Sequence, residues 1–297
     1  MTSELQKFKI FKKERDESFN IDSLDQYNLL LQFGPSDFQI GIVDSTDNKI
    51  LLVEDYILPG VTGLQERLDC YAQIFNEHQL LLANFWKSVK ISFKGRKFSI
   101  IPDNLFDGKN ARVYLDINAA VDDHTDTIQV ASLDAFGVKI IYSVETDVLG
   151  QLKKYYPVIR YHTAPQCAGL IHGFYDFIAS SDTRAHCVFI DRFTLHQAVF
   201  KNRKLAFYNI FPINKFEDYT RFISMVSDDQ RLDINKERII LWGFIGEKST
   251  HLAELKKIFP GIELGRRPGG LKFGYVFDEI PEHHYFDLFG LNHLKPT

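Results

Sequence analysis

The sequence lacks the marks of several large protein classes. No apolar run approaches the roughly eighteen residues that a membrane-spanning helix needs, and the N-terminal segment is charged where a signal peptide needs an apolar core. The net charge is only −4 and the isoelectric point is about 6.2, which gives no footprint for a nucleic acid or an anionic membrane. We therefore expect a cytoplasmic protein that inserts into no membrane and binds no nucleic acid.

Cysteine is also scarce. Cys70, Cys167 and Cys187 are the only three cysteines, an odd number, and each lies within an apolar stretch. Free cysteine is among the most buried residue types, and disulfides are rare in reducing compartments. The sequence therefore predicts buried free thiols rather than a disulfide framework.

The local signatures of some common enzyme classes are missing as well. The chain has no Walker A sequence, no G-x-G-x-x-G after a strand and no G-x-S-x-G elbow. These absences count against an enzyme without excluding an unfamiliar active site.

What the chain does contain is a pattern that occurs twice, in which short β-rich runs separated by turns are followed by an amphipathic helix. The runs of the first copy are 27–33, 38–43 and 49–58, with a helix over 64 to about 82; those of the second copy are 186–190, 194–200 and 204–213, with a helix over 216 to about 229. The sequence therefore predicts a duplicated α/β fold with mixed sheets. Two such halves usually leave a central cleft between them.

The repeat also sets the expected domain organisation. Residues 1–24 mix charges of both signs with few apolar anchors and are predicted to be a mobile arm. Residues 25–180 are expected to form a first lobe with inserted hairpins at about 88–143, and residues 181–297 a second lobe. One of the two expected hairpins joins 89–93 to 98–101, and the other joins 127–133 to 138–144. The boundary between the lobes is placed in the polar segment 180–184.

A β-β-β-α-β-α unit that occurs twice resembles the actin-like ATPase superfamily, a ribonuclease H-like fold found in sugar kinases, Hsp70 chaperones and pilus-assembly scaffolds. The segments YNLLLQFGPSDFQIGIVD, KILLVEDYIL and VKIIYSVETDVLGQLKKYYP are similar in particular to an uncharacterised Bacteroidetes family, domain of unknown function 3822. That family is grouped with the actin-like folds. The resemblance covers nearly the whole chain from about Ser18 and implies two lobes with a central cleft, but it brings no known activity.

The first nucleotide signature of the active relatives is altered here. Their first hairpin carries Asp-x-Gly, in which the carboxylate positions the metal and the glycine lets backbone N–H groups approach the phosphates. The matching place in this sequence is Gln32-Phe33-Gly34. Gln32 is neutral and cannot supply the charge that holds Mg²⁺, although Gly34 and Ser36 could form a turn that accepts an anion.

The other two signatures are also incomplete. At the second hairpin Asp191 keeps the acid and Thr194 follows it, but Phe193 replaces the glycine and would crowd a phosphate. The adenine-side motif normally pairs two small residues after the strand, and Gly243 and Gly246 match it only in part. All of these glycines could equally be ordinary turn residues.

Three further groups could bind a ligand. Arg266 and Arg267 lie in a glycine-rich loop and could clamp a phosphate or a carboxylate. The run Asp122-Asp123-His124-Thr125-Asp126 is rich in oxygen ligands but lacks the glycine and closing glutamate of a calcium loop, so a solvated turn is favoured. His283 and His284 have no metal-ligand spacing around them, and the first turn of a terminal helix is the favoured interpretation.

These departures favour a non-catalytic, actin-like scaffold that binds another protein. The alternative is a nucleotide-dependent kinase or ATPase with atypical phosphate loops, in which Asp191 is the metal-side acid. A scaffold predicts bulky or apolar filling around Gln32 and Phe193, whereas an enzyme predicts an open, polar pocket. We expect no catalytic residue, no metal site and no required cofactor, with weak binding of ATP and Mg²⁺ and the oligomeric state left open.

Overall fold

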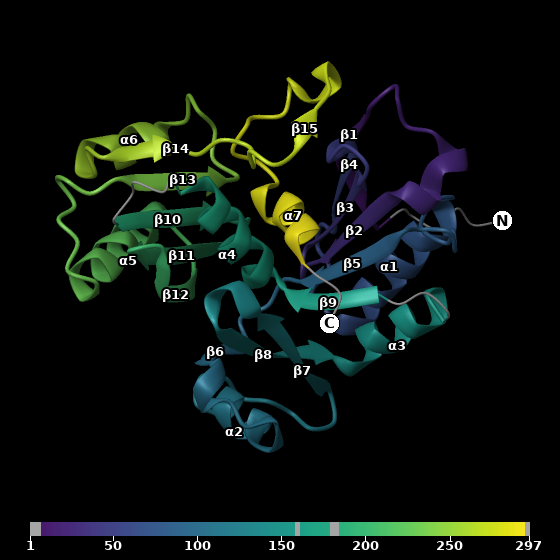
Figure 1. Cartoon of the computed structure of the whole chain (residues 1–297), viewed down its shortest axis with the longest axis horizontal. Helices are drawn as coiled ribbons and strands as arrows, with labels where there is room; N and C mark the ends of the chain where they lie inside the picture. Colours follow the sequence, from purple (N-terminus) through teal and green to yellow (C-terminus); the bar gives the residue numbers. More distant parts are fainter. Residues whose placement is uncertain (1–6, 158–160, 179–183, 295–297) are drawn as a thin grey trace. The chain divides into compact units, whose positions relative to one another are not determined.

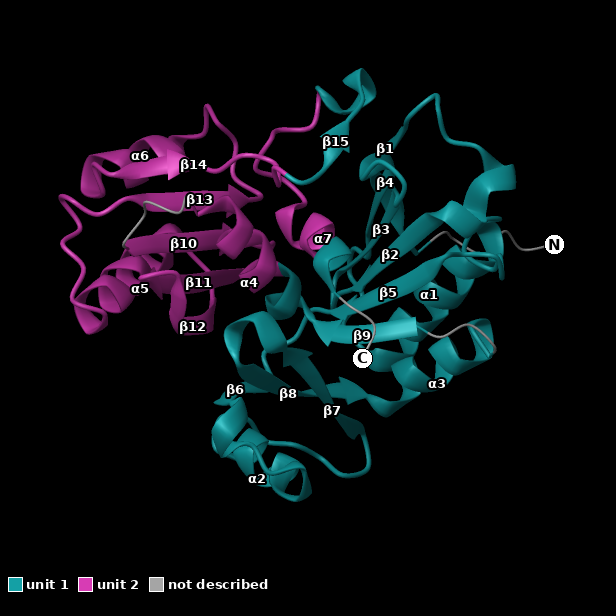
Figure 2. Ribbon diagram, viewed as in Figure 1, with its two compact units in different colours: residues 1–169, 270–278, 291–297 teal, residues 170–269, 279–290 magenta. Residues whose placement is uncertain are grey.

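The computed structural model describes residues 7–157, 161–178 and 184–294, and the chain divides into two compact units (Figure 1, Figure 2). Unit 1 comprises residues 1–169, 270–278 and 291–297, and unit 2 comprises residues 170–269 and 279–290. The predicted boundary at 180–184 lies outside the described residues apart from Arg184. The observed division falls earlier, after Gly169, and unit 1 is discontinuous because later segments return to it.

Unit 1 is built on a seven-stranded sheet. Its strands are β1 (Lys9–Arg15), β2 (Tyr27–Phe33), β3 (Asp37–Asp44), β4 (Lys49–Ile57), β5 (Ser88–Phe93), β9 (Tyr161–Pro165) and β15 (Lys272–Phe273). Strands β2, β3 and β4 form an antiparallel meander, and β5 and β9 extend the sheet in parallel on the other side of β2. The order is β1-β4-β3-β2-β5-β9, with β15 paired to β4.

Unit 2 repeats this arrangement. Its strands are β10 (Arg184–Ile190), β11 (Thr194–Lys201), β12 (Lys204–Pro212), β13 (Ile239–Gly243) and β14 (Ile262–Leu264). The order β12-β11-β10-β13-β14 corresponds strand by strand to β4-β3-β2-β5-β9 of unit 1. The predicted duplication is therefore confirmed, and with it the mixed α/β fold.

Both predicted helices form, although the first ends at Glu77 and not at about residue 82. A helix comes directly after each meander, α1 (Leu64–Glu77) in unit 1 and α5 (Phe216–Asp229) in unit 2. Ser249 caps α6 (Thr250–Ile258) by accepting a hydrogen bond from the backbone N–H of Leu252 at 3.2 Å. The other helices are α2 (Ala111–Asp116), α3 (Thr146–Tyr155), α4 (Gln166–Phe177) and α7 (Phe286–Gly290). No helix in the described ranges is long and apolar enough to cross a membrane.

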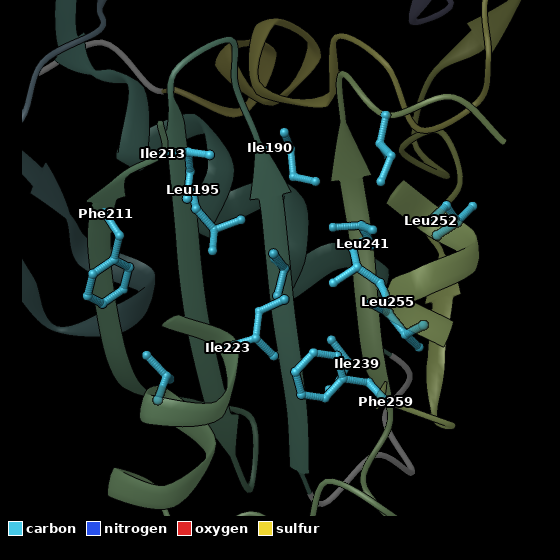
Figure 3. Packing of buried hydrophobic residues seen from close by; sticks show 14 of the residues in the cluster. Ile190, Leu195, Phe211, Ile213, Ile223, Ile239, Leu241, Leu252, Leu255 and Phe259 are labelled. Atoms are coloured by element: carbon cyan, nitrogen blue, oxygen red, sulfur yellow. The ribbon is translucent and has the colours of Figure 1, made fainter. Parts of the chain in front are cut away.

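Each unit has its own core. In unit 2, apolar side chains of the sheet, including Leu195 and Leu241, pack against Ile223 of α5 and Leu255 of α6 (Figure 3). Burying a side chain of this size stabilises a fold by about 1.5–3 kcal/mol. In unit 1 the corresponding side of the sheet is aromatic, and the ring centroid of Phe33 lies 4.7 Å from that of Phe38 and 5.0 Å from that of Tyr71. The three cysteines are free and buried, as predicted.

The insertion in unit 1 differs from the predicted pair of hairpins at 88–143. Strand β5 belongs to the main sheet, where it pairs with β2, and the insertion is one three-stranded sheet made of β6 (Phe98–Pro102), β7 (Asp126–Leu133) and β8 (Val138–Glu145). The β7–β8 hairpin is confirmed. The hairpin expected between β5 and β6 is wrong because both strands find partners that are distant in sequence.

The predicted mobile arm at 1–24 is also wrong for its described part, since residues 1–6 lie outside it. Residues 9–15 form β1, which pairs antiparallel with β4, and a short 3₁₀ helix covers Ile21–Gln26. The charged sequence gives no signal for this strand, because an edge strand is held through its backbone hydrogen bonds and leaves most of its side chains in solvent. Phe8, which is 4% exposed, anchors its start in the core.

Candidate functional site

The turn after β2 contains Gly34, the predicted phosphate-side glycine. Its backbone N–H donates to the carbonyl of Asp37 at 2.9 Å and closes the turn, while the hydroxyl of Tyr71 donates to the Gly34 carbonyl at 2.6 Å. A Cβ atom at position 34 would lie 1.9 Å from the Asp37 carboxylate and 2.9 Å from the side chain of Lys94. A larger residue at this position would have to displace the side chains of Asp37 and Lys94.

Asp37 and Lys94 form a buried ion pair over this turn. The Nζ atom of Lys94 lies 2.6 Å from Oδ2 of Asp37, and the two side chains are 5% and 2% exposed. The positive charge of Lys94 is thereby matched within the protein. A phosphate brought beside Gly34 would meet the Asp37 carboxylate at close range in a poorly solvated place, where like charges repel strongly.

The other predicted residues of this hairpin have structural contacts. Gln32 is fully buried in β2. Ser36 lies in the turn, and its carbonyl accepts a hydrogen bond from the backbone N–H of Leu58 at 2.8 Å. This bond ties the turn to the residue that follows β4.

The second hairpin is closed by the same backbone hydrogen bond as the first, but its acidic residue stands at a different position in the turn. The backbone N–H of Asp191 donates to the carbonyl of Thr194 at 2.9 Å, as that of Gly34 does to Asp37. Asp191 therefore takes the position of Gly34, and the counterpart of Gln32 is Phe189. The side chain of Asp191 is turned back on its own loop, where Oδ1 accepts a hydrogen bond from the N–H of Arg192 at 2.8 Å.

Phe193 and Thr194 complete this turn. Phe193 is 64% exposed, so it does not fill a core. The hydroxyl of Thr194 lies 3.2 Å from Nε2 of the buried His196, whose Nδ1 lies 2.8 Å from the hydroxyl of Tyr208. Thr194 is thus part of a chain of polar contacts along β11 and β12.

Gly243 is needed where the ends of the parallel strands β10 and β13 lie side by side. It has a φ of +99°, and a Cβ atom at this position would lie 1.9 Å from the carbonyl oxygen of Ile190. Its N–H donates to the carbonyl of His283 at 2.8 Å, and the N–H of Phe244 donates to that of Ile190 at 2.8 Å. By contrast, Gly246 is exposed and has room for a side chain.

The arginine loop does not present two unoccupied guanidinium groups. Arg266 is exposed, and its carbonyl accepts the indole N–H of Trp242 at 3.0 Å. Arg267 is half-buried and donates from Nη2 to the carbonyl of Ile280 at 2.9 Å. The structure brings Asp191 and Gly243 together at the ends of β10 and β13, whereas these arginines hold the backbone of unit 2.

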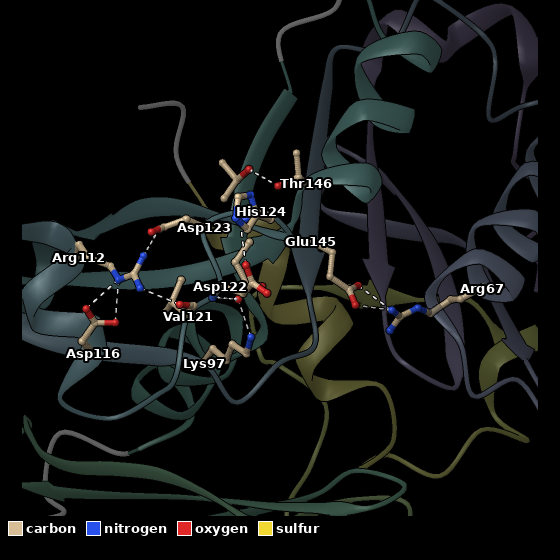
Figure 4. Close-up of polar contacts among 12 residues, drawn as sticks. Arg67, Lys97, Arg112, Asp116, Val121, Asp122, Asp123, His124, Glu145 and Thr146 are labelled. Atoms are coloured by element: carbon tan, nitrogen blue, oxygen red, sulfur yellow. Dashed lines mark hydrogen bonds and ion pairs between the residues drawn. The ribbon is translucent and has the colours of Figure 1, made fainter.

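The acidic run at 122–126 is a turn whose carboxylates have partners, as Figure 4 shows. Asp126 accepts a hydrogen bond from the backbone N–H of Asp122 at 3.0 Å and pairs with Lys97 at 2.6 Å. Asp123 pairs with Arg112. The acids fix the turn that leads into β7.

The two neighbouring histidines near α7 are structural as well. His283 is 1% exposed, and its Nε2 donates to the carbonyl of Ile245 at 2.7 Å. Burial and the neighbouring His283 lower the pKa of His284 to about 4. Over the part of the chain that the structure describes, no group of three His, Cys, Asp or Glu side chains could hold a metal ion.

Sequence comparison places the chain in a family. The family described as "Protein of unknown function (DUF3822)" matches residues 16–262, which is most of the chain. The chain belongs to this family. No curated protein matches the sequence.

Solved structures show the fold of this DUF3822 chain. One is a protein of unknown function with an actin-like ATPase fold from Bacteroides thetaiotaomicron. It is 18% identical to this chain, the match covers 83% of this chain and 93% of the Bacteroides chain, and the TM-score is 0.73. Another is a chain of the PilM-PilN type IV pilus biogenesis complex. It is 12% identical, the match covers 91% of this chain and 99% of that chain, and the TM-score is 0.58. The DUF3822 chain therefore has the actin-like ATPase fold.

A polar row across the sheet of unit 1 escaped the sequence argument. Ser92, Gln32, Gln39 and Asp55 are successive cross-strand neighbours on β5, β2, β3 and β4, and all four are fully buried. Neighbours directly opposite each other share a face of the sheet. Within the described residues, the side-chain amide of Gln39 and the hydroxyl of Ser92 have no hydrogen-bond partner.

The signal for this row was a glutamine inside each of two apolar strands, LLLQF and DFQIG. Gln32 was compared only with the Asp-x-Gly motif, and its neighbours across the sheet cannot be identified without the strand register. Amides and a hydroxyl can hold water or another uncharged polar group. With Asp55 as its one carboxylate, the row lacks the several oxygen charges that hold a divalent cation.

Proposed function

We propose that this protein has lost the ATPase chemistry of its fold and acts by binding another protein. The observation that carries this proposal is the buried pair of Asp37 and Lys94, which fills the space beside Gly34 where a phosphate would approach. Phosphoryl transfer depends almost wholly on positioned charges and metal ions. Residues arranged in this way do not fit a magnesium-bound nucleotide.

The positions of the expected hairpin acids support the same proposal. Gln32 is neutral, and its counterpart in the second hairpin is Phe189. Neither side chain can hold Mg²⁺ through a carboxylate. The rival function, a kinase or ATPase with atypical phosphate loops, would depend on Asp191, which already accepts a hydrogen bond from the N–H of Arg192.

Exposed apolar side chains do not by themselves mark a binding surface here. Phe85 and Ile117 are each 74% exposed, and Phe193 is 64% exposed, but they lie in separate segments of the chain. Single exposed apolar side chains are normal on protein surfaces. A chain of similar fold occurs in the PilM-PilN complex, so the fold is compatible with a protein partner.

A cytoplasmic location is part of the same proposal. The chain keeps three cysteines, and all of them are free and buried. Reducing compartments preserve thiols in this state.

Calorimetric titration of the purified protein with ATP and ADP in the presence of Mg²⁺ tests the loss of nucleotide chemistry. We expect no saturable heat up to millimolar ligand. The matched variant is Asp191→Ala, because the rival function depends on that carboxylate. Saturable binding by the wild type that is lost in Asp191→Ala would overturn the proposal and restore the nucleotide hypothesis.

A further inference from the structure

Strand β1 leaves one side of the unit 1 sheet open. It pairs with β4 over Leu52–Ile57, and β15 pairs with β4 at Lys49 and Ile50, so β15 does not lie along the outer side of β1. Among the described residues no strand pairs with that outer side. An uncovered edge strand offers backbone N–H and C=O groups to another extended chain.

This edge is strongly basic although the whole chain carries a net charge of −4. Residues 7–15 contain Lys7, Lys9, Lys12, Lys13 and Arg15 but only one acid, Glu14. Lys12 and Lys13 have carboxylate partners at 2.7 and 3.1 Å. Lys7, Lys9 and Arg15 are exposed and have no ion-pair partner within the described residues.

The excess positive charge selects among occupants of the edge. A second copy of this chain would bring its own basic β1 alongside, and like charges on directly paired strands are destabilising. An acidic segment would instead meet opposite charge on the exposed Lys9 and Arg15. The exposed side chains of Ile10 and Phe11, at 50% and 54%, offer it apolar contact.

A groove of about 490 Å³ lies at the carboxyl end of the same strand. Its lining is mixed: Phe19, Ile21 and Leu80 are apolar, and the rest is polar or charged, namely Arg15, Asp16, Glu17, Asn20 and Gln79. The two acids have partners, since Asp16 accepts a hydrogen bond from Lys49 and Glu17 accepts one from Tyr275. Ile21 is 58% exposed. The groove can therefore receive an apolar side chain close to the basic edge.

We infer that β1 and this groove form a docking site for an extended, acidic segment of a partner protein, which adds a strand to the unit 1 sheet and places an apolar side chain in the groove. This docking site rests on the proposed function and names the partner class. Main-chain hydrogen bonds supply affinity in this mode, and side-chain contacts supply specificity.

Fluorescence anisotropy with labelled peptides of about eight residues, the length of an ordinary strand, tests the site. The acidic probe alternates Glu and Val and ends in Leu; a basic probe has Lys in place of Glu, and a third probe is the acidic one with alternate backbone nitrogens methylated. We expect saturable binding of the acidic probe. The basic and methylated probes should bind at least about tenfold more weakly, since one lacks the charge match and the other the backbone donors.

The protein variants separate this edge from general electrostatic attraction. Lys9→Glu should weaken the acidic probe at least about fivefold, because an exposed favourable charge becomes an unfavourable one. The matched control is Lys204→Glu on β12, an edge strand of unit 2 whose lysine is also exposed, and it should leave binding unchanged. Equal weakening by both variants would overturn the inference.

Equal binding of the methylated probe would also overturn it, since strand addition needs the backbone N–H groups. Failure of the acidic probe to bind the wild-type protein would reject this docking site alone. The proposed loss of nucleotide chemistry would stand or fall separately, by the calorimetric titration.

Discussion

Breaking the buried ion pair between Asp37 and Lys94 is expected to destabilise unit 1 by about 3–5 kcal/mol, whichever partner is removed. The two charged atoms are 2.6 Å apart and the side chains are 2% and 5% exposed, so removal of one partner takes a close opposite charge away from a charge that stays buried. Replacing both leaves no buried charge. The variants Asp37→Asn and Lys94→Met should therefore each be costly, whereas the double variant should cost well below the sum.

Urea unfolding followed by tryptophan fluorescence can measure this effect in the right unit. The chain has two tryptophans, Trp86 in unit 1 and Trp242 in unit 2. A Trp242→Phe background leaves Trp86 as the reporter, so that two separate transitions are not averaged.

The matched control is Lys97→Met. Lys97 pairs with Asp126 at the same 2.6 Å, but the lysine is 45% exposed, and Asp126, which is 5% exposed, keeps a hydrogen bond from the backbone N–H of Asp122. Loss of the lysine should cost about 1 kcal/mol or less, because solvent screens the pair. Single variants of Asp37 and Lys94 that cost no more than this control, or a double variant equal to their sum, would refute the reasoning.

The remaining predictions concern unit 2 and can be checked by chemical unfolding. Gly243→Ala should cost at least about 3 kcal/mol because its φ is +99° and the new Cβ would lie 1.9 Å from the carbonyl oxygen of Ile190. The control is Gly246→Ala, whose new Cβ would lie at an ordinary contact distance of 3.6 Å from Ser249 and which should be near neutral, so equal costs for the two variants would contradict this reasoning. Ser249→Ala removes the cap of α6 and should cost about 1 kcal/mol, so an unchanged midpoint would speak against the cap. Burial lowers the pKa of His186 from 6.5 to about 4. Because the unfolded state then binds more protons between these values, the free energy of unfolding should fall by up to about 3 kcal/mol as pH drops from 6.5 to 4. His186→Gln should flatten this slope, and an unchanged slope would exclude His186 as its cause.

Local patterns predicted the elements of the fold well. Strand β2 and helix α5 have the predicted bounds, because alternating β-rich runs and a 3.6-residue apolar period depend on neighbours in sequence. Pairing was harder. Strand β5 was expected to form a hairpin with β6, but its register with β2 spans about sixty residues of chain and has no local signature.

The hairpin that holds Gln32 and Gly34 was predictable, but the contacts around it were not. The sequence led to Gln32 and Gly34 as the altered phosphate-side residues, and the hairpin does lie there. The ion pair that covers Gly34 could not be predicted, because Lys94 is 57 residues from Asp37 and neither local sequence indicates that they pair. The edge strand β1 was missed for a related reason, since pairing through the backbone leaves a charged sequence unchanged.

The discontinuity of unit 1 has a consequence for synthesis on the ribosome. The carbonyl of Asn292 accepts a hydrogen bond from the ammonium group of Lys90 at 2.5 Å, and burial lowers the pKa of Lys90 to about 8. Until residues 291–293 have been translated, Lys90 lacks this acceptor, and β4 lacks β15 until residue 273 has been added. Unit 1 is thus the first to emerge but cannot be completed before unit 2 has been made, so a nascent chain stalled between the two would expose an unfinished sheet to chaperones.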